Sequence, residues 1–450
     1  MIKNIKIKDI GELKNGLNFN KDQFGKGIPV VNVKNLFNGR FVDLKNLEEI
    51  KTDGISNLKS YLINEGDILF SRSSVVRSGA GKSALVPNLK KNFTFSGFII
   101  RLRIKDKKKF DPSFLNYVLS TNKYRKLFQQ YSTGTSISNV SQDLINSVEI
   151  DFPDILTQRR LSKAISFFDD KIETNIRLNS SLKMISDKIF KSWFINFDPV
   201  KAKINGHTTD LSEEINNLFP NSMQDSQLGK IPKGWKVSKL SNFDFEIESG
   251  RRPQGGIDKS LKEGTPSVGA ESITSIGNFD YSKVKYVHDE FSRIQKKGKV
   301  QNFDVALYKD GGRPGEFLPR VSLYGDGFPF KNFLVNEHVF LLRSKFLGQP
   351  FLYFLVSNQN FLEQLMALGS SKAAQPGLNQ EEVKNILFVL PDKMLIDHFN
   401  TLIKPILKKQ LLIGLQNKNL IKIRDIVLPK ILSGEIDLQD FDKKIQSKIL

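Results

Sequence analysis

The sequence predicts an α+β fold in which two globular, mixed α/β domains are separated by two long antiparallel spacer helices, as a pseudo-twofold internal repeat. Three observations predict this class. Short segments recur at a nearly constant offset, which is typical of a duplicated unit. Each half contains short β-type runs and many glycines. Each half then ends in about 40 residues whose apolar side chains follow helical spacing.

The repeat is visible in matched segments of low identity. Pro29 in IPVVNVKNL corresponds to Pro266 in TPSVGAESI, 237 positions later. Asp67 in GDILFSRSS corresponds to Asp304 in FDVALYKDG at the same offset. A chain of 450 residues is also long for one domain, so two or more units are expected.

The domain order follows from this repeat. A polar, turn-rich segment without sustained periodicity reads as the connector that lets the chain return for its second copy. The expected order is a first domain at 1–153, a central spacer helix at 154–198, a linker at 199–230, a second domain at 231–391, and a C-terminal spacer helix with a tail at 392–450.

Two long helices are expected, from about 155 to 196 and from about 393 to 432. Each would be roughly 60 Å long. Because a single helix with one apolar face is unstable in water, we expect the two to pair. Pro405 predicts a kink or a restart in the second helix. The predicted stripes are Leu161, Ile165, Phe168, Ile172, Ile176, Leu182, Ile185, Ile189 and Trp193, and Ile396, Phe399, Ile403, Ile406, Leu412, Leu415, Leu420, Ile423, Val427 and Ile431.

Composition restricts the partners and the chemistry. The formal charge of +20 favours nucleic acid, an anionic membrane surface or an acidic protein, although a solvated lysine-rich surface is the simpler alternative. The absence of cysteine excludes disulfides, thiol catalysis and cysteine-based zinc sites, and the four histidines show no metal-ligand spacing. The sequence has no signal-peptide pattern and no apolar run near the ~18 residues of a membrane span, so a soluble cytoplasmic protein is expected.

The segment SGAGKS resembles the end of a phosphate-binding loop. Such a loop needs glycine where Val76 stands, and it must open into a helix. Only four residues separate Lys82 from Pro87, so a helix does not fit there. A basic, glycine-hinged loop near another polyanion is the better interpretation.

Five co-ordered segments together resemble the specificity subunit of type I restriction–modification systems, over nearly the whole chain. They are IFKSWFINFDPVKAK (189–203), LGKIPKGWKVSKL (228–240), NEHVFLLRS (336–344), AQPGLNQEEV (374–383) and RDIVLPKILSGEI (424–436).

The resemblance implies a non-catalytic subunit with two target-recognition domains that read a bipartite double-stranded DNA target, one half-site each. It implies assembly with two modification subunits, which carry S-adenosylmethionine and methylate adenine. It further implies restriction subunits that translocate and cleave DNA. S-adenosylmethionine, ATP and Mg are then expected on the partner subunits, and this chain is expected to bind no cofactor and no metal.

The missing catalytic motifs agree with that expectation. None of the 17 prolines adjoins another, which excludes the Asn/Asp-Pro-Pro-Tyr/Phe loop of adenine methyltransferases. Pro153-Asp154 followed by Asp169-Asp170-Lys171 fits a nuclease spacing. These acids fall inside the predicted helix rather than on neighbouring strands, so a magnesium site is not expected.

Candidate DNA contacts come from loops that combine cations or amides with glycine, because phosphates need cations and base edges need forked or amide groups. In the first half these are Arg72, Arg77 and Lys82, and the corresponding loop of the second half offers Lys309 and Arg313. SGRRPQGG adds Arg251, Arg252 and Gln254, and its counterpart NGLNFNKDQ offers Asn18, Asn20 and Gln23. A third pair of loops contributes Thr133, Ser136, Lys372 and Gln375, or alternatively only caps the following helix.

Two other classes of protein remain as alternatives at this point. The chain could be a nuclease or NTPase in its own right, or a purely structural bridge that uses its helices to hold other proteins. Steep loss of DNA affinity with salt would favour the DNA reader over the bridge.

Overall fold

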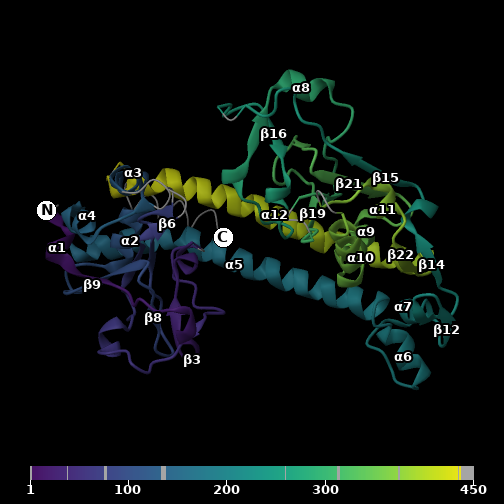
Figure 1. The fold of residues 1–450 in the computed structure, drawn as a ribbon, viewed down its shortest axis with the longest axis horizontal. Coiled ribbons are helices and arrows are strands. Elements are labelled where there is room, and N and C mark those ends of the chain that lie inside the picture. The colour runs from purple at the N-terminus through teal and green to yellow at the C-terminus, as the bar shows by residue number, and fades with distance from the viewer. Residues whose placement is uncertain are drawn as a thin grey trace. The chain divides into compact units, whose positions relative to one another are not determined.

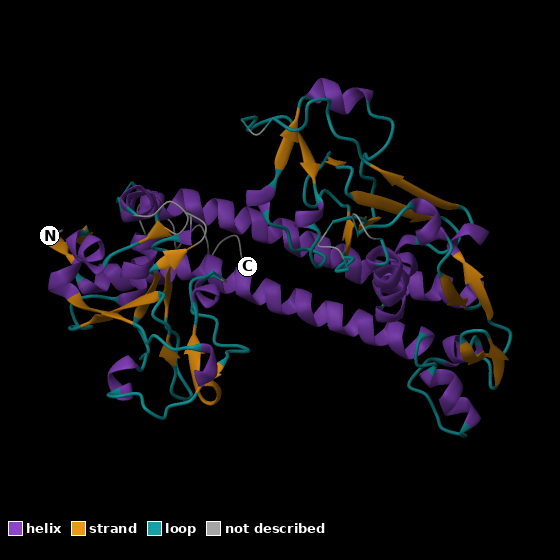
Figure 2. Ribbon diagram, viewed as in Figure 1, coloured by secondary structure: helices purple, strands orange, loops and turns teal. Residues whose placement is uncertain are grey.

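The computed structural model describes residues 3–37, 39–74, 79–132, 138–258, 260–311, 315–372, 376–433 and 435–436. The chain forms two compact units. The first contains Met1–Glu173 with Leu420–Leu450, and the second contains Thr174–Asn419. Each unit combines a β-rich domain with part of both long helices, α5 (Ile155–Phe194) and α12 (Lys393–Leu432) (Figure 1; Figure 2).

The first unit is built on a four-stranded antiparallel sheet in the order β2-β9-β5-β7. A three-stranded sheet has the order β4-β3-β8, and the first strand of the chain pairs with the strand before α5, as β1-β11. The strands are β1 (Lys3–Lys6), β2 (Gly11–Asn15), β3 (Phe24–Val31), β4 (Glu49–Ile50), β5 (Ile68–Ser71), β7 (Ser83–Leu85), β8 (Thr94–Phe95), β9 (Ile99–Ile104) and β11 (Glu149–Phe152).

The second unit repeats this topology. Its four-stranded sheet has the order β15-β21-β18-β19, its three-stranded sheet β17-β16-β20, and its closing pair is β14-β22. The two copies therefore share strand order and connection, which confirms the predicted internal repeat at the level of the fold. The strands are β14 (Lys236–Lys239), β15 (Phe245–Ser249), β16 (Thr265–Val268), β17 (Lys285–Val287), β18 (Asp304–Tyr308), β19 (Val321–Tyr324), β20 (Leu334–Val335), β21 (Val339–Ser344) and β22 (Leu387–Leu390).

Short helices are repeated as well. Asp111 caps the first of them by accepting a hydrogen bond from the Phe114 amide, and Pro112 occupies its first turn. In the second copy a proline again lies in the first turn. The corresponding helices are α2 (Pro112–Ser120) and α9 (Gln349–Ser357), α3 (Asn122–Tyr131) and α10 (Gln359–Ser370), and α4 (Gln142–Ser147) and α11 (Gln380–Lys384).

A buried ion pair is found at the same place in both copies. Asp67 is 1% exposed and accepts two hydrogen bonds from Arg103, at 2.9 and 2.7 Å. Asp304 is also 1% exposed and is bonded in the same way by Arg343, at 2.6 Å for each bond. Each aspartate also accepts the backbone N–H three residues before it, which closes the turn into the strand. The constant offset of these aspartates in the sequence thus reflects one repeated structural role.

The two ends of the helix pair belong to different cores. In the first unit, Leu161 and Ile165 of α5 pack with Leu428 and Ile431 of α12 in the core beneath the four-stranded sheet. In the second unit, aromatic side chains dominate, and Phe190 lies 5.6 Å from Phe399 between ring centroids. These pairings, low residue number against high, make α5 and α12 antiparallel, as predicted.

The middle of the helix pair differs from the predicted apolar seam. Asn175 is buried, and its side-chain amide donates to Gln416 at 3.0 Å and to Asn417 at 2.8 Å. Ile176 and Ile185, both assigned to the stripe, are 57% and 49% exposed. The prediction of a continuous apolar seam was wrong here, because amide contacts between the helices replace apolar packing over these turns.

Two further expectations are corrected. Helix α12 continues through Pro405 instead of restarting there. Residues after α5, expected to lack regular structure, form α6 (Asp198–Ile204), α7 (Glu213–Asn217) and the hairpin β12 (Met223–Ser226)–β13 (Gly229–Pro232). Phe219 anchors this segment, because its ring packs on Trp193 at 5.5 Å.

Candidate nucleic-acid interface

The first unit brings four separate segments together into a first loop cluster, defined as residues 15–20, 71–74 with 79–82, 96–98 and 138–142. Strand β6 (Ser73–Ser74) pairs with β10 (Ser138–Asn139), which joins two of the predicted DNA-contacting loops. Gln142 donates to the Asn15 side chain at 2.9 Å, which adds the third. Sequence-distant loops expected to touch DNA therefore form one surface.

Arg72 holds the remaining segment of the first loop cluster. Its backbone N–H donates to the Phe98 carbonyl at 2.8 Å, and its guanidinium donates to the Gly97 carbonyl at 3.2 Å. The side chain is half-buried. Arg72 thus positions the 96–98 turn, in addition to any contact with DNA.

The second unit forms an equivalent second loop cluster, defined as residues 249–256, 308–311, 336–338 and 376–378. Asp310 forms a bridge with Gly377, which repeats the β6–β10 pairing of the first copy. The Lys309 N–H donates to the His338 carbonyl at 3.1 Å, as Arg72 does to Phe98. A Cβ on Gly250 would lie 1.6 Å from the Val335 carbonyl oxygen, so only glycine allows this segment to approach so closely.

The ammonium groups of Lys82 and Lys372 form hydrogen bonds to other groups of the chain. The Lys82 ammonium donates to the Phe37 carbonyl at 3.1 Å, and burial lowers its pKa, with further lowering by Arg125 and Arg424. Lys372 donates to the Gly377 carbonyl at 2.7 Å and to Glu382 at 2.8 Å. Both lysines therefore stabilise the loops of their clusters.

Arg251, Arg252 and Gln254 are exposed. The Arg252 side chain is 61% exposed and its Nε lies 3.9 Å from Glu337. Lys309 is less accessible, because its ammonium lies 3.7 Å from Asp310 and over the Phe340 ring at 5.0 Å. Among the described candidates of the second cluster, the arginines and Gln254 are the best placed for an external ligand.

Five candidates lie outside the described residues. They are Arg77, Thr133, Ser136, Arg313 and Gln375.

Sequence reasoning missed two residues of the loop clusters. Phe98 is 62% exposed, although it is a large apolar side chain. His338 occupies the corresponding position in the second copy, and its Nδ1 lies 2.5 Å from an Asp310 oxygen while its Nε2 lies 3.4 Å from Glu337. Their position in the repeat could have identified them, since Phe98 directly precedes β9 and His338 directly precedes β21, the second strand of each four-stranded sheet.

The structure excludes a phosphate-binding loop at Gly81-Lys82-Ser83. Strand β7 begins at Ser83, so the turn enters a strand and not a helix. Gly81 has a φ of +66°, and a Cβ there would lie 2.7 Å from Phe128. The glycine is required for packing and backbone conformation.

The nuclease-like acids also have structural roles. Asp169 accepts hydrogen bonds from the Arg424 guanidinium and the Tyr117 hydroxyl, each at 2.7 Å. Asp170 accepts from Arg40 at 2.8 Å. Burial, followed by the charge of Asp169, raises the pKa of the Tyr117 phenol. Within the described ranges no cluster of three or more His, Asp or Glu side chains could hold a metal ion.

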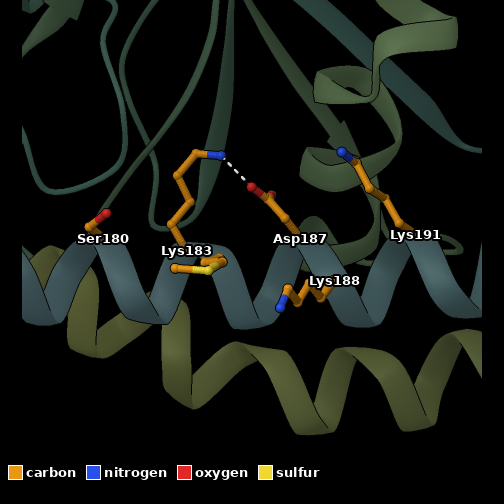
Figure 3. Close-up of a pocket in the computed structure, with 6 residues that line it drawn as sticks. Ser180, Lys183, Asp187, Lys188 and Lys191 are labelled. Atoms are coloured by element: carbon orange, nitrogen blue, oxygen red, sulfur yellow. Dashed lines mark hydrogen bonds and ion pairs between the residues drawn. The ribbon is translucent and has the colours of Figure 1, made fainter. Parts of the chain in front are cut away.

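One face of α5 carries a shallow hollow of about 440 Å³ (Figure 3). Lys183 and Asp187 pair across it at 2.5 Å, and Lys188 and Lys191 are among its other lining residues. This lining provides cations but no arrangement for acid–base or nucleophilic catalysis. In the part of the chain that the structure describes, no helix is both long enough and apolar enough to cross a bilayer.

The duplicated α+β unit, each copy gathering polar and cationic loops at one place, fits a nucleic-acid-recognition class of protein. Comparison with known proteins makes this specific. Residues 2–184 match the type I restriction modification DNA specificity domain. Two curated relatives are similar over most of the chain. The MjaIX specificity subunit of Methanocaldococcus jannaschii is 26% identical, covering 97% of this chain and 93% of that protein. The HindI specificity subunit of Haemophilus influenzae is 24% identical, covering 90% and 94%.

A solved structure agrees in fold. The type I restriction–modification S subunit from M. genitalium covers 96% of each chain with a TM-score of 0.51 and 16% identity. Residues 2–184 thus match the DNA specificity domain of type I restriction–modification systems, and the chain as a whole is similar to specificity subunits of such systems. By family the specificity subunit is non-catalytic, and it provides the DNA target specificity of its complex.

Proposed function

We propose that residues 1–153 and 231–391 are two target-recognition domains, each reading one half-site of a bipartite duplex target. The observation that carries this proposal is the repetition of one loop cluster with different side chains. The first cluster presents Asn18 and Phe98, whereas the second presents Arg252 and His338 at its surface. Equivalent backbones with different base-reading groups suit two different half-sites.

The partner assignment extends the similarity to type I specificity subunits. We propose that two modification subunits bind the chain and supply S-adenosylmethionine for adenine methylation. Restriction subunits with ATP and Mg would then translocate and cleave DNA. Exposed apolar side chains on the long helices support this docking, since Met184 is 52% exposed, Ile423 46% and Ile426 52%.

A domain exchange tests the half-site assignment. Residues 1–153 are replaced by the corresponding domain of another specificity subunit, and the methylome of cells that also carry the modification subunit is sequenced. Only one half of the methylated target is expected to change, because each cluster reads its own bases. A change in both halves after a single exchange would contradict the proposal.

The chain alone provides the control. Filter binding to random duplex should weaken steeply as salt rises, because lysine and arginine release condensed counterions when they contact phosphates. Methylation, cleavage and ATP hydrolysis by the isolated chain should stay at background. Little DNA affinity at low salt would favour a purely structural bridge instead.

A further inference from the structure

Phe98 is an exposed aromatic ring on a turn that the protein holds firmly. Arg72 bonds the Gly97 and Phe98 carbonyls, and the Gly97 N–H donates to the Leu17 carbonyl at 2.6 Å. The Ser96 N–H donates to the Val31 carbonyl at 3.0 Å. The turn is therefore anchored on both sides of the ring, so the ring's position is set before any ligand binds.

Phe98 is the most exposed of the phenylalanines that the structure describes. Phe24 and Phe37 are each 37% exposed, but Phe24 packs edge-on against Phe19 and Phe37 lies under the Lys82 ammonium. Phe98 is 62% exposed. Burying this ring would stabilise the fold, so a ring that stays in water on an anchored turn is available to contact an external ligand.

An amide lies against the turn that carries this ring. Asn18 is exposed, and its Oδ1 lies 2.0 Å from the position that a Cβ on Gly97 would occupy. The side chain of Asn18 thus covers the glycine that precedes Phe98. A side chain at position 97 would displace this amide, so glycine at 97 allows Asn18 to lie against the turn that carries Phe98.

This pair of groups matches one base pair. An asparagine amide can bond to N6 and N7 of adenine, and an apolar side chain can contact the C5-methyl group of thymine, both in the major groove. We infer that Asn18 and Phe98 read an A·T base pair in the half-site bound by the first loop cluster. This inference rests on the proposed function and specifies its chemistry.

The second copy lacks this pair of groups. His338 replaces Phe98 and is flanked by Asp310 and Glu337, which are hydrogen-bonding groups. Arg252 is exposed in the neighbouring segment. The second half-site should therefore show no comparable dependence on a thymine methyl group, and the duplication provides an internal control.

The test removes single groups from both partners. The methylated target is first read from the methylome, and the full chain is then titrated with duplexes in which each thymine in turn is replaced by deoxyuridine, which lacks the methyl group. Wild-type affinity should fall about fourfold at one thymine of the first half-site, the effect of about one buried methyl. Phe98→Ala should bind the thymine and deoxyuridine duplexes equally.

Three further variants test the Asn18 amide, provide a control and test the second half-site. Asn18→Ala should lose the preference for adenine over 7-deazaadenine at the partner base, because the N7 acceptor is then no longer used. Leu156→Ala, which truncates a side chain 65% exposed on α5, is the matched control and should retain the methyl effect. His338→Ala should weaken binding through the other half-site only.

The outcomes separate the inference from the proposed function. The inference is overturned if Phe98→Ala retains the wild-type ratio of thymine to deoxyuridine affinity, or if no thymine of the first half-site shows a methyl effect in the wild-type chain. In each case the wild-type chain still selects its target. Absence of any sequence preference in the wild-type chain would instead refute the proposed function.

Discussion

At the scale of single residues, the buried aspartates account for the constant sequence offset. Asp67 and Asp304 are almost fully buried, and each is bonded by an arginine from the neighbouring strand. A buried carboxylate needs such a partner, because an uncompensated charge in the interior is costly. The positions therefore tolerate little change even where the surrounding identity is low.

Replacing Asp67 tests how much the buried ion pair contributes to stability. Asp67→Ala leaves Arg103 without its carboxylate and should lower the free energy of unfolding by about 3 kcal/mol. Urea unfolding of the whole chain measures the change. Glu12→Ala removes a carboxylate that is 72% exposed and 3.8 Å from Lys105, so it should cost less than about 1 kcal/mol. Equal effects of the two variants would argue against a structural role for the buried pair.

At the scale of elements, the sequence predicted which segments are helical better than how the helices touch. Apolar side chains at helical spacing predict a helix, and this prediction does not depend on which of its side chains contact the partner helix. The contact itself depends on the rotation of both helices, and Asn175 shows that polar groups occupy it in the middle of α5. A periodic apolar pattern cannot identify such amide contacts, because it counts only apolar positions.

Two neighbouring substitutions distinguish amide contacts from apolar packing in the middle of the helix pair. Asn175→Ala removes two inter-helix hydrogen bonds from a buried site and should lower the free energy of unfolding by about 1–2 kcal/mol. Ile176→Ala truncates a side chain that is 57% exposed and should change it by less than about 0.5 kcal/mol. Urea unfolding of the isolated chain measures both. A larger loss of stability for Ile176→Ala than for Asn175→Ala would support a continuous apolar seam instead.

The loop clusters are also decided at this scale. Arg72, Lys82, Lys309 and Lys372 were predicted as cations facing DNA, yet each has a partner within its own unit. Charge and glycine content predicted the loops as candidate DNA contacts, and that these loops come together is a finding of the structure alone. These two properties did not predict which charged atoms the protein uses for itself, because that depends on carbonyl and carboxylate groups far away in the sequence.

At the scale of the whole molecule, we expect the helix pair to set the length of the gap in the target. Seven residues inserted at facing positions of α5 and α12 add about two turns, or about 10 Å, which equals about three base pairs of duplex. Methylome sequencing should then show both half-sites unchanged and a gap about three base pairs longer. The same seven residues inserted at position 208, between α6 and α7, should leave the gap unaltered. A new half-site sequence in either variant would contradict the separate roles of helices and domains.

The sequence by itself determined the duplication, the two long helices, the excess of positive charge and the family resemblance. These features are carried by periodic spacing, by composition and by ordered motifs, and each can be detected along the chain without knowing what touches what. Only the tertiary structure decided that four segments meet in each loop cluster, that amides join the middle of the helices, and that Phe98 is left in water on a turn that Asn18 contacts. The physical reason is that contacts between distant residues depend on strand pairing and on the competition for buried hydrogen bonds, and neither is written in the local sequence.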